Sequence, residues 1–175
     1  MSSPLDVKKL MMFLTKLGDG AKSDGNCYLT GGTSALLIGW RDSTLDADIK
    51  FDPEPSGVFD AISNLKYEFD INVELASPDN FIPPLKLWKS RSQFIGKFGK
   101  LNVFHYDFTA QALSKLARGH QRDIADIHAM LERGLISKQS ISEGFAEITL
   151  DLKRYPAIDE NEFRNRVLRF LGELK

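Results

Sequence analysis

This sequence has few cysteines and histidines, and its positive and negative residues are nearly equal in number. The 175 residues contain one cysteine, Cys27, and three histidines. One cysteine excludes an internal disulfide and a zinc site built from several cysteines, so we expect Cys27 to be a small buried hydrophobe. The 23 Lys and Arg residues nearly balance 24 Asp and Glu, for a formal net charge of −1. This balance excludes a global basic field for nucleic acid, although a local basic patch stays open.

Long apolar runs are also missing. No run approaches membrane-spanning length, and residues 11–14 are too short for a signal-peptide core and lack a small-residue cleavage site. We therefore expect a cytoplasmic protein without a membrane partner. At 42% hydrophobic and 27% charged residues, the chain can bury a core without disulfides, which predicts a single domain over residues 1–175.

A glycine turn is the first feature that indicates chemistry. Residues 28–30 are typical of a strand end, and Gly31 and Gly32 allow a sharp turn and a close approach to a ligand because they have no Cβ. Residues 33–38 then predict a short helix. The free N–H groups and positive dipole of its N-terminus suit a phosphate, and the Ser34 hydroxyl adds a donor.

Two carboxylates follow on a predicted strand. Apolar and charged residues alternate over 45–51, so Asp46 and Asp48 share one face, about 7 Å apart at roughly 3.3 Å per residue. Two such carboxylates repel each other unless a cation lies between them. Mg²⁺ (or Mn²⁺) takes one or two carboxylates together with substrate phosphates, so a triphosphate in the glycine turn would complete the shell.

The order of these features resembles the nucleotidyltransferase fold of the polymerase-beta superfamily. The strings Leu29-Thr-Gly-Gly-Thr-Ser34 and Arg41-Asp-Ser-Thr-Leu-Asp-Ala-Asp48 are similar to the AbiEii and MenT-like toxin branch, and the resemblance extends over about residues 28–135. It implies an α/β (α+β) fold with a short mixed sheet and helices packed on it. The core would span about residues 26–108, with a helical C-terminal portion over about 109–175.

Two residues before the carboxylates have alternative roles. In the related families an arginine or serine at this place helps to hold the nucleotide, which implies Arg41 and Ser43. Arg41 would otherwise form a surface ion pair with Asp42, and Ser43 would cap the turn.

A third carboxylate is expected on a neighbouring strand. Residues 58–65 predict a helix with Phe59 turned inward, and the alternation over 66–76 predicts a strand beside Asp46 and Asp48. The superfamily usually takes its third carboxylate from such a strand, to hold a second metal or to activate the attacking hydroxyl. Glu74 is the candidate and Asp70 is the alternative.

The segment 86–106 combines basic and aromatic residues around a predicted hairpin with its turn at 96–99. Such a combination can bind RNA, but lysines also protect the exposed edge of a sheet, which we favour here. The residues concerned are Lys86, Lys89, Arg91, Lys97 and Lys100, with Trp88, Phe94 and Phe98 between them.

Two predicted helices follow, the first capped by Thr109. In the AbiEii and MenT-like branch a lysine on the first helix reaches the nucleotide phosphates, and an aspartate at the start of the second completes the site. The resemblance implies Lys115 and Asp123 for these roles, with Asp126 as the alternative aspartate. Without the resemblance, these residues would form an ordinary charged helix face in which Arg122 pairs with Asp126.

The apolar spacing predicts packing helices over 4–17, 141–152 and 159–174. The resemblance implies transfer of a nucleoside monophosphate from an NTP to an acceptor hydroxyl, with Gly32 and Ser34 on the β- and γ-phosphates. The acceptor would be the 3′ end of tRNA or a protein side chain. The protein would act as a toxin or antitoxin with a cognate partner. The alternative is an inactive nucleotide- or RNA-binding module of the same fold.

Overall fold

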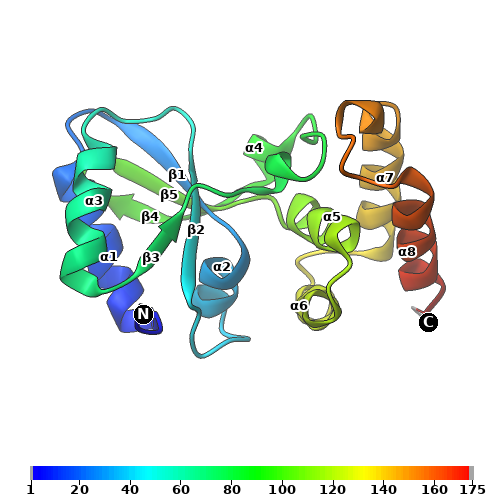
Figure 1. Cartoon of the computed structure of the whole chain (residues 1–175), viewed down its shortest axis with the longest axis horizontal. Coiled ribbons are helices and arrows are strands. Elements are labelled where there is room, and N and C mark those ends of the chain that lie inside the picture. Colours follow the sequence, from blue (N-terminus) through cyan, green and yellow to red (C-terminus); the bar gives the residue numbers. More distant parts are fainter. Residues whose placement is uncertain (1, 174–175) are drawn as a thin grey trace. The chain divides into compact units, whose positions relative to one another are not determined.

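A computed structural model describes residues 2–173. The chain forms two compact units: one comprises the residues up to Ser77 together with Ser92–Tyr106, and the other comprises Pro78–Arg91 together with the residues from Asp107 onward. Figure 1 shows that the first unit is a sheet with helices and that the second is helical. Residues 78–91, which we assigned to the core, lie with the helices of the second unit.

The sheet of the first unit is mixed, as predicted. Its strand order is β3-β2-β1-β5-β4, with parallel pairs β1–β5 and β2–β3 and antiparallel pairs β1–β2 and β4–β5. The strands are β1 (Gly25–Leu29), β2 (Asp46–Phe51), β3 (Asn72–Glu74), β4 (Gln93–Phe98) and β5 (Leu101–His105).

One face of this sheet is buried under α1 (Val7–Gly20) and α3 (Val58–Phe69), which lie side by side in Figure 1. Cys27, Ile49 and Val103 point into this core, and burial raises the pKa of the Cys27 thiol to about 12, as expected for an inert buried hydrophobe. Side chains alternate between the faces of a strand. The registered pairs therefore place another set of side chains on the opposite face, which we call the second face: Asp46, Asp48 and Lys50 from β2, Tyr28 from β1, Phe104 from β5, Phe94 from β4 and Glu74 from β3.

The first helix has the predicted buried stripe, but it begins and ends later than predicted. Leu10, Phe13, Leu14 and Leu17 are fully buried. Asp6 caps the helix by accepting from the Lys9 N–H at 2.8 Å. The helix continues past residue 17 to Gly20, and Gly18 packs directly on the backbone of β4.

The predicted strand over 66–76 is wrong for its first half. Helix α3 continues to Phe69, and Asp70 ends it in a left-handed conformation with φ 50°. Only Asn72–Glu74 pair with β2. Tyr67, which belongs to the apolar positions of that alternation, lies on the helix instead and is 90% exposed. Phe59, predicted to point inward, is 43% exposed.

The hairpin is confirmed with a shorter turn. Strand β4 reaches Phe98, and the turn is made at Gly99, whose φ of 56° favours glycine. A register shift between Phe94 and Gly96 marks a β-bulge. Strand β4 lies at the edge of the sheet, which is where lysines that protect an edge are expected.

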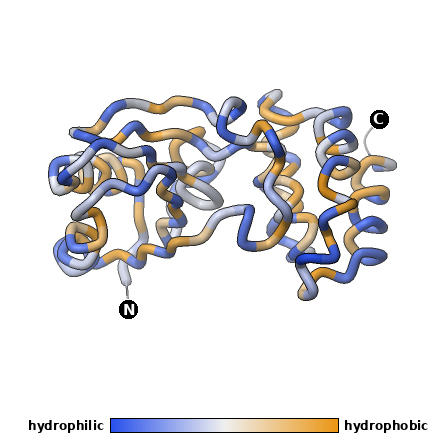
Figure 2. The backbone as a smooth tube through the Cα atoms, turned by 90° about the horizontal axis from the view of Figure 1, so that it is seen from above, coloured by the Kyte–Doolittle hydropathy of each residue, from blue (hydrophilic) through white to orange (hydrophobic). Residues whose placement is uncertain are grey.

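The second unit packs around α5 (Phe108–Arg118), which contacts α6 (Gln121–Glu132), α7 (Lys138–Thr149) and α8 (Glu160–Glu173). Shorter elements are η1 (Pro78–Asn80), α4 (Trp88–Arg91) and η2 (Leu152–Arg154). Phe145 and Phe163 pack edge to face at 5.1 Å. Hydrophobic and hydrophilic stretches alternate along these helices in Figure 2, as expected for helices with one buried face.

The cap of α5 differs from the prediction. Asp107 is the N-cap, and its carboxylate accepts from the Thr109 N–H at 3.2 Å, so Thr109 is a helical residue. Arg91 donates to the same carboxylate through Nε at 3.1 Å and Nη2 at 2.7 Å. This pair fixes α4 to the start of α5.

Gly18→Ala is expected to destabilise the first unit. A Cβ at Gly18 would lie 1.9 Å from the Phe98 carbonyl oxygen, and backbone cannot move aside as a side chain can. We expect a loss of about 1–3 kcal/mol in urea unfolding, typical of overpacking. The matched control is Gly172→Ala, because a Cβ there meets nothing within 4 Å. That change is expected to be neutral or to stabilise by up to about 1 kcal/mol, and equal losses in both variants would contradict the packing argument.

Candidate functional site

The glycine turn connects β1 to helix α2 (Gly31–Ile38), so the helix is two residues longer than predicted. Gly31 has φ 57°, and a Cβ on it would lie 3.0 Å from Asp48 Oδ2. A Cβ on Gly32 would lie 2.2 Å from Thr44 Oγ1. Both glycines are therefore needed to bring the N-terminus of α2 against the Asp48 carboxylate and the Thr44 side chain. Thr44 is a neighbour of the turn that the sequence pattern did not single out.

Asp46 and Asp48 occupy alternate positions of β2, as predicted. Both are half-buried on the second face, whereas Ala47 between them is fully buried in the core. The Thr30 N–H donates to the Asp48 carbonyl at 3.1 Å, and the Thr33 hydroxyl donates to it at 3.2 Å. These bonds fix the start of α2 to β2 at the carboxylates.

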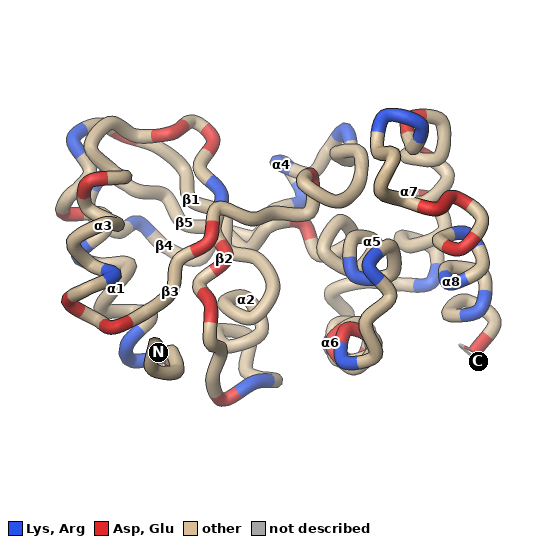
Figure 3. Tube along the Cα trace, viewed as in Figure 1, with Lys and Arg blue, Asp and Glu red and all other residues tan. Residues whose placement is uncertain are grey.

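Glu74 lies directly beside the pair. Strand β3 runs parallel to β2, with Asp46 opposite Asn72 and Asp48 opposite Glu74. The Asn72 amide donates to Asp46 Oδ1 at 2.8 Å and to Glu74 Oε1 at 3.1 Å. Acidic segments of β2 and β3 are neighbours in Figure 3.

Asp70, the alternative to Glu74, has a different place. It ends α3, and its carboxylate accepts from the Ser3 N–H at 3.1 Å. Its carbonyl also accepts from the Ser3 N–H, at 2.9 Å. Asp70 therefore ties the N-terminal segment to α3, whereas Glu74 is in register with Asp48.

The chemistry of these side chains fits a magnesium ion. Among residues 2–173, no group of three or more His, Cys, Asp or Glu side chains is arranged to hold a metal by itself. An Mg²⁺ ion bound with a nucleotide needs only one or two carboxylates, because phosphate oxygens and water complete its shell. Asp46 and Asp48 meet this requirement beside the N-terminus of α2, which lies directly against Asp48.

Ser34 is buried just inside α2. Its Oγ donates to the Leu29 carbonyl at 3.1 Å and lies 2.9 Å from His105 Nδ1. Burial lowers the pKa of His105 to about 4, so the ring is neutral near pH 7. The three residues connect the ends of β1 and β5 to α2. The expected contact of Ser34 with a phosphate stays a prediction.

Arg41 and Ser43 lie in the segment between α2 and β2. Arg41 is half-buried and Ser43 is exposed. The neighbouring Thr44 pairs with Leu5 through two backbone hydrogen bonds of 2.8 and 3.0 Å, which hold this segment to the N-terminal residues. The nucleotide contacts expected of Arg41 and Ser43 stay predictions.

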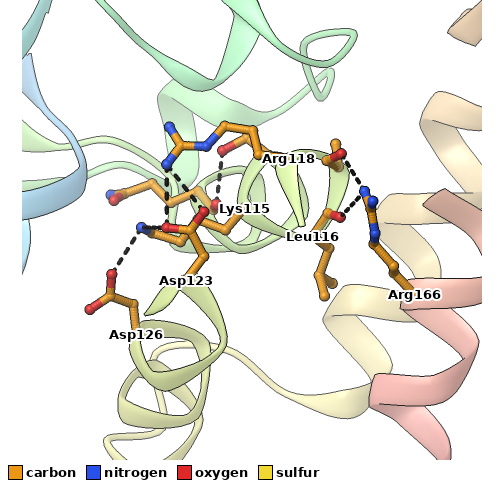
Figure 4. Close-up of polar contacts among 9 residues, drawn as sticks. Lys115, Leu116, Arg118, Asp123, Asp126 and Arg166 are labelled. Atoms are coloured by element: carbon orange, nitrogen blue, oxygen red, sulfur yellow. Dashed lines mark hydrogen bonds and ion pairs between the residues drawn. The ribbon is translucent and has the colours of Figure 1, made fainter. Parts of the chain in front are cut away.

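The second unit contains a buried cluster of charges, shown in Figure 4. The Lys115 ammonium donates to Asp123 Oδ1 at 3.1 Å and to Asp126 Oδ2 at 3.0 Å. Arg118 donates to both oxygens of Asp123, at 3.3 and 3.2 Å. Lys115, Asp123 and Asp126 are all buried. The opposite charges balance, as buried ionised groups require.

Arg166 contacts the C-terminal end of the helix that carries Lys115. It extends from α8 to the C-terminus of α5, where its Nη1 donates to the carbonyls of Leu116 and Ala117 at 3.4 and 2.8 Å. A cation at this end of a helix satisfies carbonyls that lack intrahelical partners. The helix that holds Lys115 is thus fixed at both ends, by Asp107 and by Arg166.

The predicted site residues fall into two groups. The first unit brings Gly31, Asp46, Asp48 and Glu74 together around β2. The second unit joins Lys115, Asp123 and Asp126 in one ion-pair cluster. A role of that cluster at a nucleotide held by the first group stays a prediction.

A family model named "Nucleotidyltransferase of unknown function (DUF6036)" matches residues 6–171, and the chain therefore belongs to this family. Searches of curated proteins and of solved structures found no match. Within the described chain, no helix has both the length and the apolar character that a bilayer crossing requires.

His105 is expected to make stability depend on pH. Its pKa is about 4 in the folded protein, against an ordinary value of 6.5, so between these values the unfolded chain binds more protons at this position. Stability from this group is complete above about pH 6.5 and decreases as the pH falls toward 4. His105→Asn should reduce the loss of unfolding free energy between pH 7 and pH 5, measured in urea. His128→Asn is the control, and an unchanged pH dependence in His105→Asn would contradict the assignment.

Lys115→Met is expected to destabilise the second unit by about 3–5 kcal/mol, because the buried Asp126 carboxylate loses its ammonium partner and Asp123 keeps only its pair with Arg118. Thermal and urea unfolding measure the change. The exposed Lys153→Met is the matched control, expected within about 0.5 kcal/mol of the parent protein. A small effect in both variants would show that the cluster is not an essential buried ion pair.

Proposed function

We propose that this protein is a magnesium-dependent nucleotidyltransferase that transfers a nucleoside monophosphate from an NTP to an acceptor hydroxyl. The observation that carries the proposal is the approach of the α2 N-terminus to Asp48, with Glu74 in register on the next strand. Membership of a family named for nucleotidyl transfer supports the reaction class.

The N-terminus of α2 is the proposed phosphate site. The first N–H groups of a helix lack intrahelical partners, and the helix dipole favours negative charge there. Gly31 and Gly32 carry no Cβ, so this N-terminus lies directly against Asp48 and Thr44, and a β- or γ-phosphate bound at its N–H groups would be next to the proposed magnesium ligand. Ser34 acts from inside the helix by holding its first turn to β1, and a phosphate that reached Ser34 Oγ would have to displace one of its present bonds.

Asp46 and Asp48 are the proposed magnesium ligands. A bound Mg²⁺ would neutralise phosphate charge and orient the triphosphate for attack. The Asn72 amide holds Asp46 and Glu74 at a fixed separation, which orients both carboxylates before a substrate binds.

Glu74 is the proposed base. It is exposed at the end of β3, where an acceptor can reach it. The acceptor hydroxyl loses its proton to Glu74 as its oxygen forms a bond to the α-phosphorus. The bond from that phosphorus to the bridging oxygen breaks, and pyrophosphate leaves. Positioning and electrostatics provide most of the catalysis in such reactions.

Lys115 is the proposed source of positive charge for the leaving pyrophosphate, with Asp123 or Asp126 completing the site, and with Arg41 and Ser43 as further nucleotide contacts. The ammonium of Lys115 already has two carboxylate partners. Contact with a phosphate would therefore require it to exchange one of these bonds, and the Asp123 charge would then be balanced by Arg118.

The acceptor is proposed from the resemblance to AbiEii and MenT-like proteins alone. That resemblance suggests the 3′ end of tRNA or a protein side chain, and a toxin or antitoxin role with a cognate partner. The alternative is a module of the same fold that binds a nucleotide or RNA without transferring it. NTP titration and a transfer assay separate these alternatives.

The first test is calorimetric titration of each NTP with and without Mg²⁺. The parent protein should bind at least one NTP in a magnesium-dependent manner, and Asp46→Asn/Asp48→Asn should lose this dependence because it lacks both ligands. Asp24→Asn, an exposed carboxylate in a loop of the same unit, is the matched control and should bind as the parent does.

A labelled NTP then tests transfer. Incorporation of label into an RNA or protein acceptor that Glu74→Gln lowers by at least about 100-fold would support the enzyme, in line with general base catalysis. Magnesium-dependent binding without incorporation would favour the inactive module. Binding of no NTP by the parent protein would overturn the transferase and leave only a module that binds RNA.

A further inference from the structure

The Asn72 amide lies between two of the three carboxylates that the proposed reaction uses. Its Nδ2 donates to Asp46 Oδ1 at 2.8 Å on the neighbouring strand and to Glu74 Oε1 at 3.1 Å on its own strand. Strands β2 and β3, which carry these residues, are neighbours in Figure 3. Since an amide nitrogen has two hydrogens, both are used on carboxylates.

The orientation of this amide follows from the chemistry of its partners. An ionised carboxylate only accepts hydrogen bonds, whereas an amide has a donating nitrogen and an accepting oxygen. With two carboxylate oxygens at hydrogen-bond distance, only the nitrogen can face both of them. Asn72 therefore places partial positive charge where a cation shared by Asp46 and Glu74 would otherwise lie.

The spacing of the two accepting oxygens does not fit a shared magnesium ion. The N–H bonds of an amide diverge by about 120°, so oxygens at 2.8 and 3.1 Å from the nitrogen lie roughly 5 Å apart. Opposite oxygens of an octahedral Mg²⁺ shell are only about 4 Å apart, because each lies about 2.0–2.1 Å from the ion. While the amide keeps both bonds, these two oxygens cannot bind the same ion.

Backbone geometry holds the amide in this place. Val73 packs into the core of the first unit, so the residues on either side of it, Asn72 and Glu74, point toward the carboxylates of β2. Asn72 is also in register with Asp46. This separation agrees with the finding that, over residues 2–173, no three His, Cys, Asp or Glu side chains converge as metal ligands.

We propose that Asn72 takes the place of a second cation between Asp46 and Glu74, so that the site binds a single magnesium ion. Asp46 and Asp48 hold that ion, and Glu74 remains a base for the acceptor hydroxyl. Asn72 is thus a positioning residue, since it acts through the two carboxylates that it contacts. The inference rests on the proposed function for the identity of the ion, but the place of the amide can be tested without an NTP.

Asn72→Asp tests the place of the amide by urea unfolding with and without Mg²⁺. The change replaces a donor by a carboxylate next to Asp46 and Glu74, so repulsion should lower the unfolding midpoint in the absence of a divalent cation. Saturating Mg²⁺ should restore most of the lost midpoint, because an ion that binds only the folded state stabilises it. The parent protein should show a smaller response to Mg²⁺.

Asn102→Asp is the matched control. Asn102 lies on β5, two strands away from β2 in the same sheet, and its amide donates to Asn26 at 3.2 Å. The variant adds the same charge where no carboxylate takes part in the bond that is lost. Its unfolding midpoint should respond to Mg²⁺ no more than that of the parent protein.

Equilibrium dialysis against Mn²⁺ and each NTP in turn counts the cations directly. The parent protein should retain one Mn²⁺ for each bound NTP, and Asn72→Asp should retain two because the place of the amide is then open to a cation. The count in the parent protein decides the question even if Asn72→Asp does not fold.

Two results would overturn the inference while leaving the proposed function intact. One is a count of two Mn²⁺ for each NTP in the parent protein, which would mean that the amide gives way to a second ion. The other is a folded Asn72→Asp whose midpoint responds to Mg²⁺ no more than that of Asn102→Asp. If the parent protein binds no NTP, the proposed function fails, and the Mg²⁺ response of Asn72→Asp alone then decides the place of the amide.

Discussion

The contact between the N-terminus of α2 and strand β2 is the constraint on which the candidate site depends. It exists only because Gly31 and Gly32 carry no side chain, so that backbone meets the Asp48 carboxylate and Thr44 directly. The Thr30 N–H and the Thr33 hydroxyl both bond to the carbonyl of Asp48. The same short segment therefore provides a helix N-terminus and a carboxylate, and their separation is set by the backbone rather than by flexible side chains.

The two groups of charged residues differ in their surroundings, and this difference determines what each can do. Asp46 and Asp48 are only half-buried, so water or a ligand can still reach both carboxylates. Asp46 also accepts a hydrogen bond from the Asn72 amide. Lys115, Asp123 and Asp126 are buried and bonded to one another. A buried ion pair costs desolvation energy that its geometry must offset, so the second group acts first as a structural element of the helical unit.

Sequence patterns predicted elements correctly where the apolar residues fitted either the helical spacing or the strand alternation, but not both. The alternation over 45–51 indicated the carboxylate strand, and the spacing of Leu10, Phe13, Leu14 and Leu17 indicated the first helix. The pattern over 66–70 fitted both periods, because Phe69 can lie on a buried face of a helix or of a strand. The structure has a helix there, and Phe69 packs against the core from its last turn.

The sequence by itself determined the glycine turn, the paired carboxylates and their order along the chain, because each depends on residue type and local spacing. Tertiary structure decided which side chains meet. The register of β3 placed Glu74 beside Asp48, and the packing of α6 on α5 provided Lys115 with two aspartates. The bulge in β4 turned Phe94 to the second face and Phe98 to the core. Strand register and helix packing are set by long-range contacts, which local spacing does not encode.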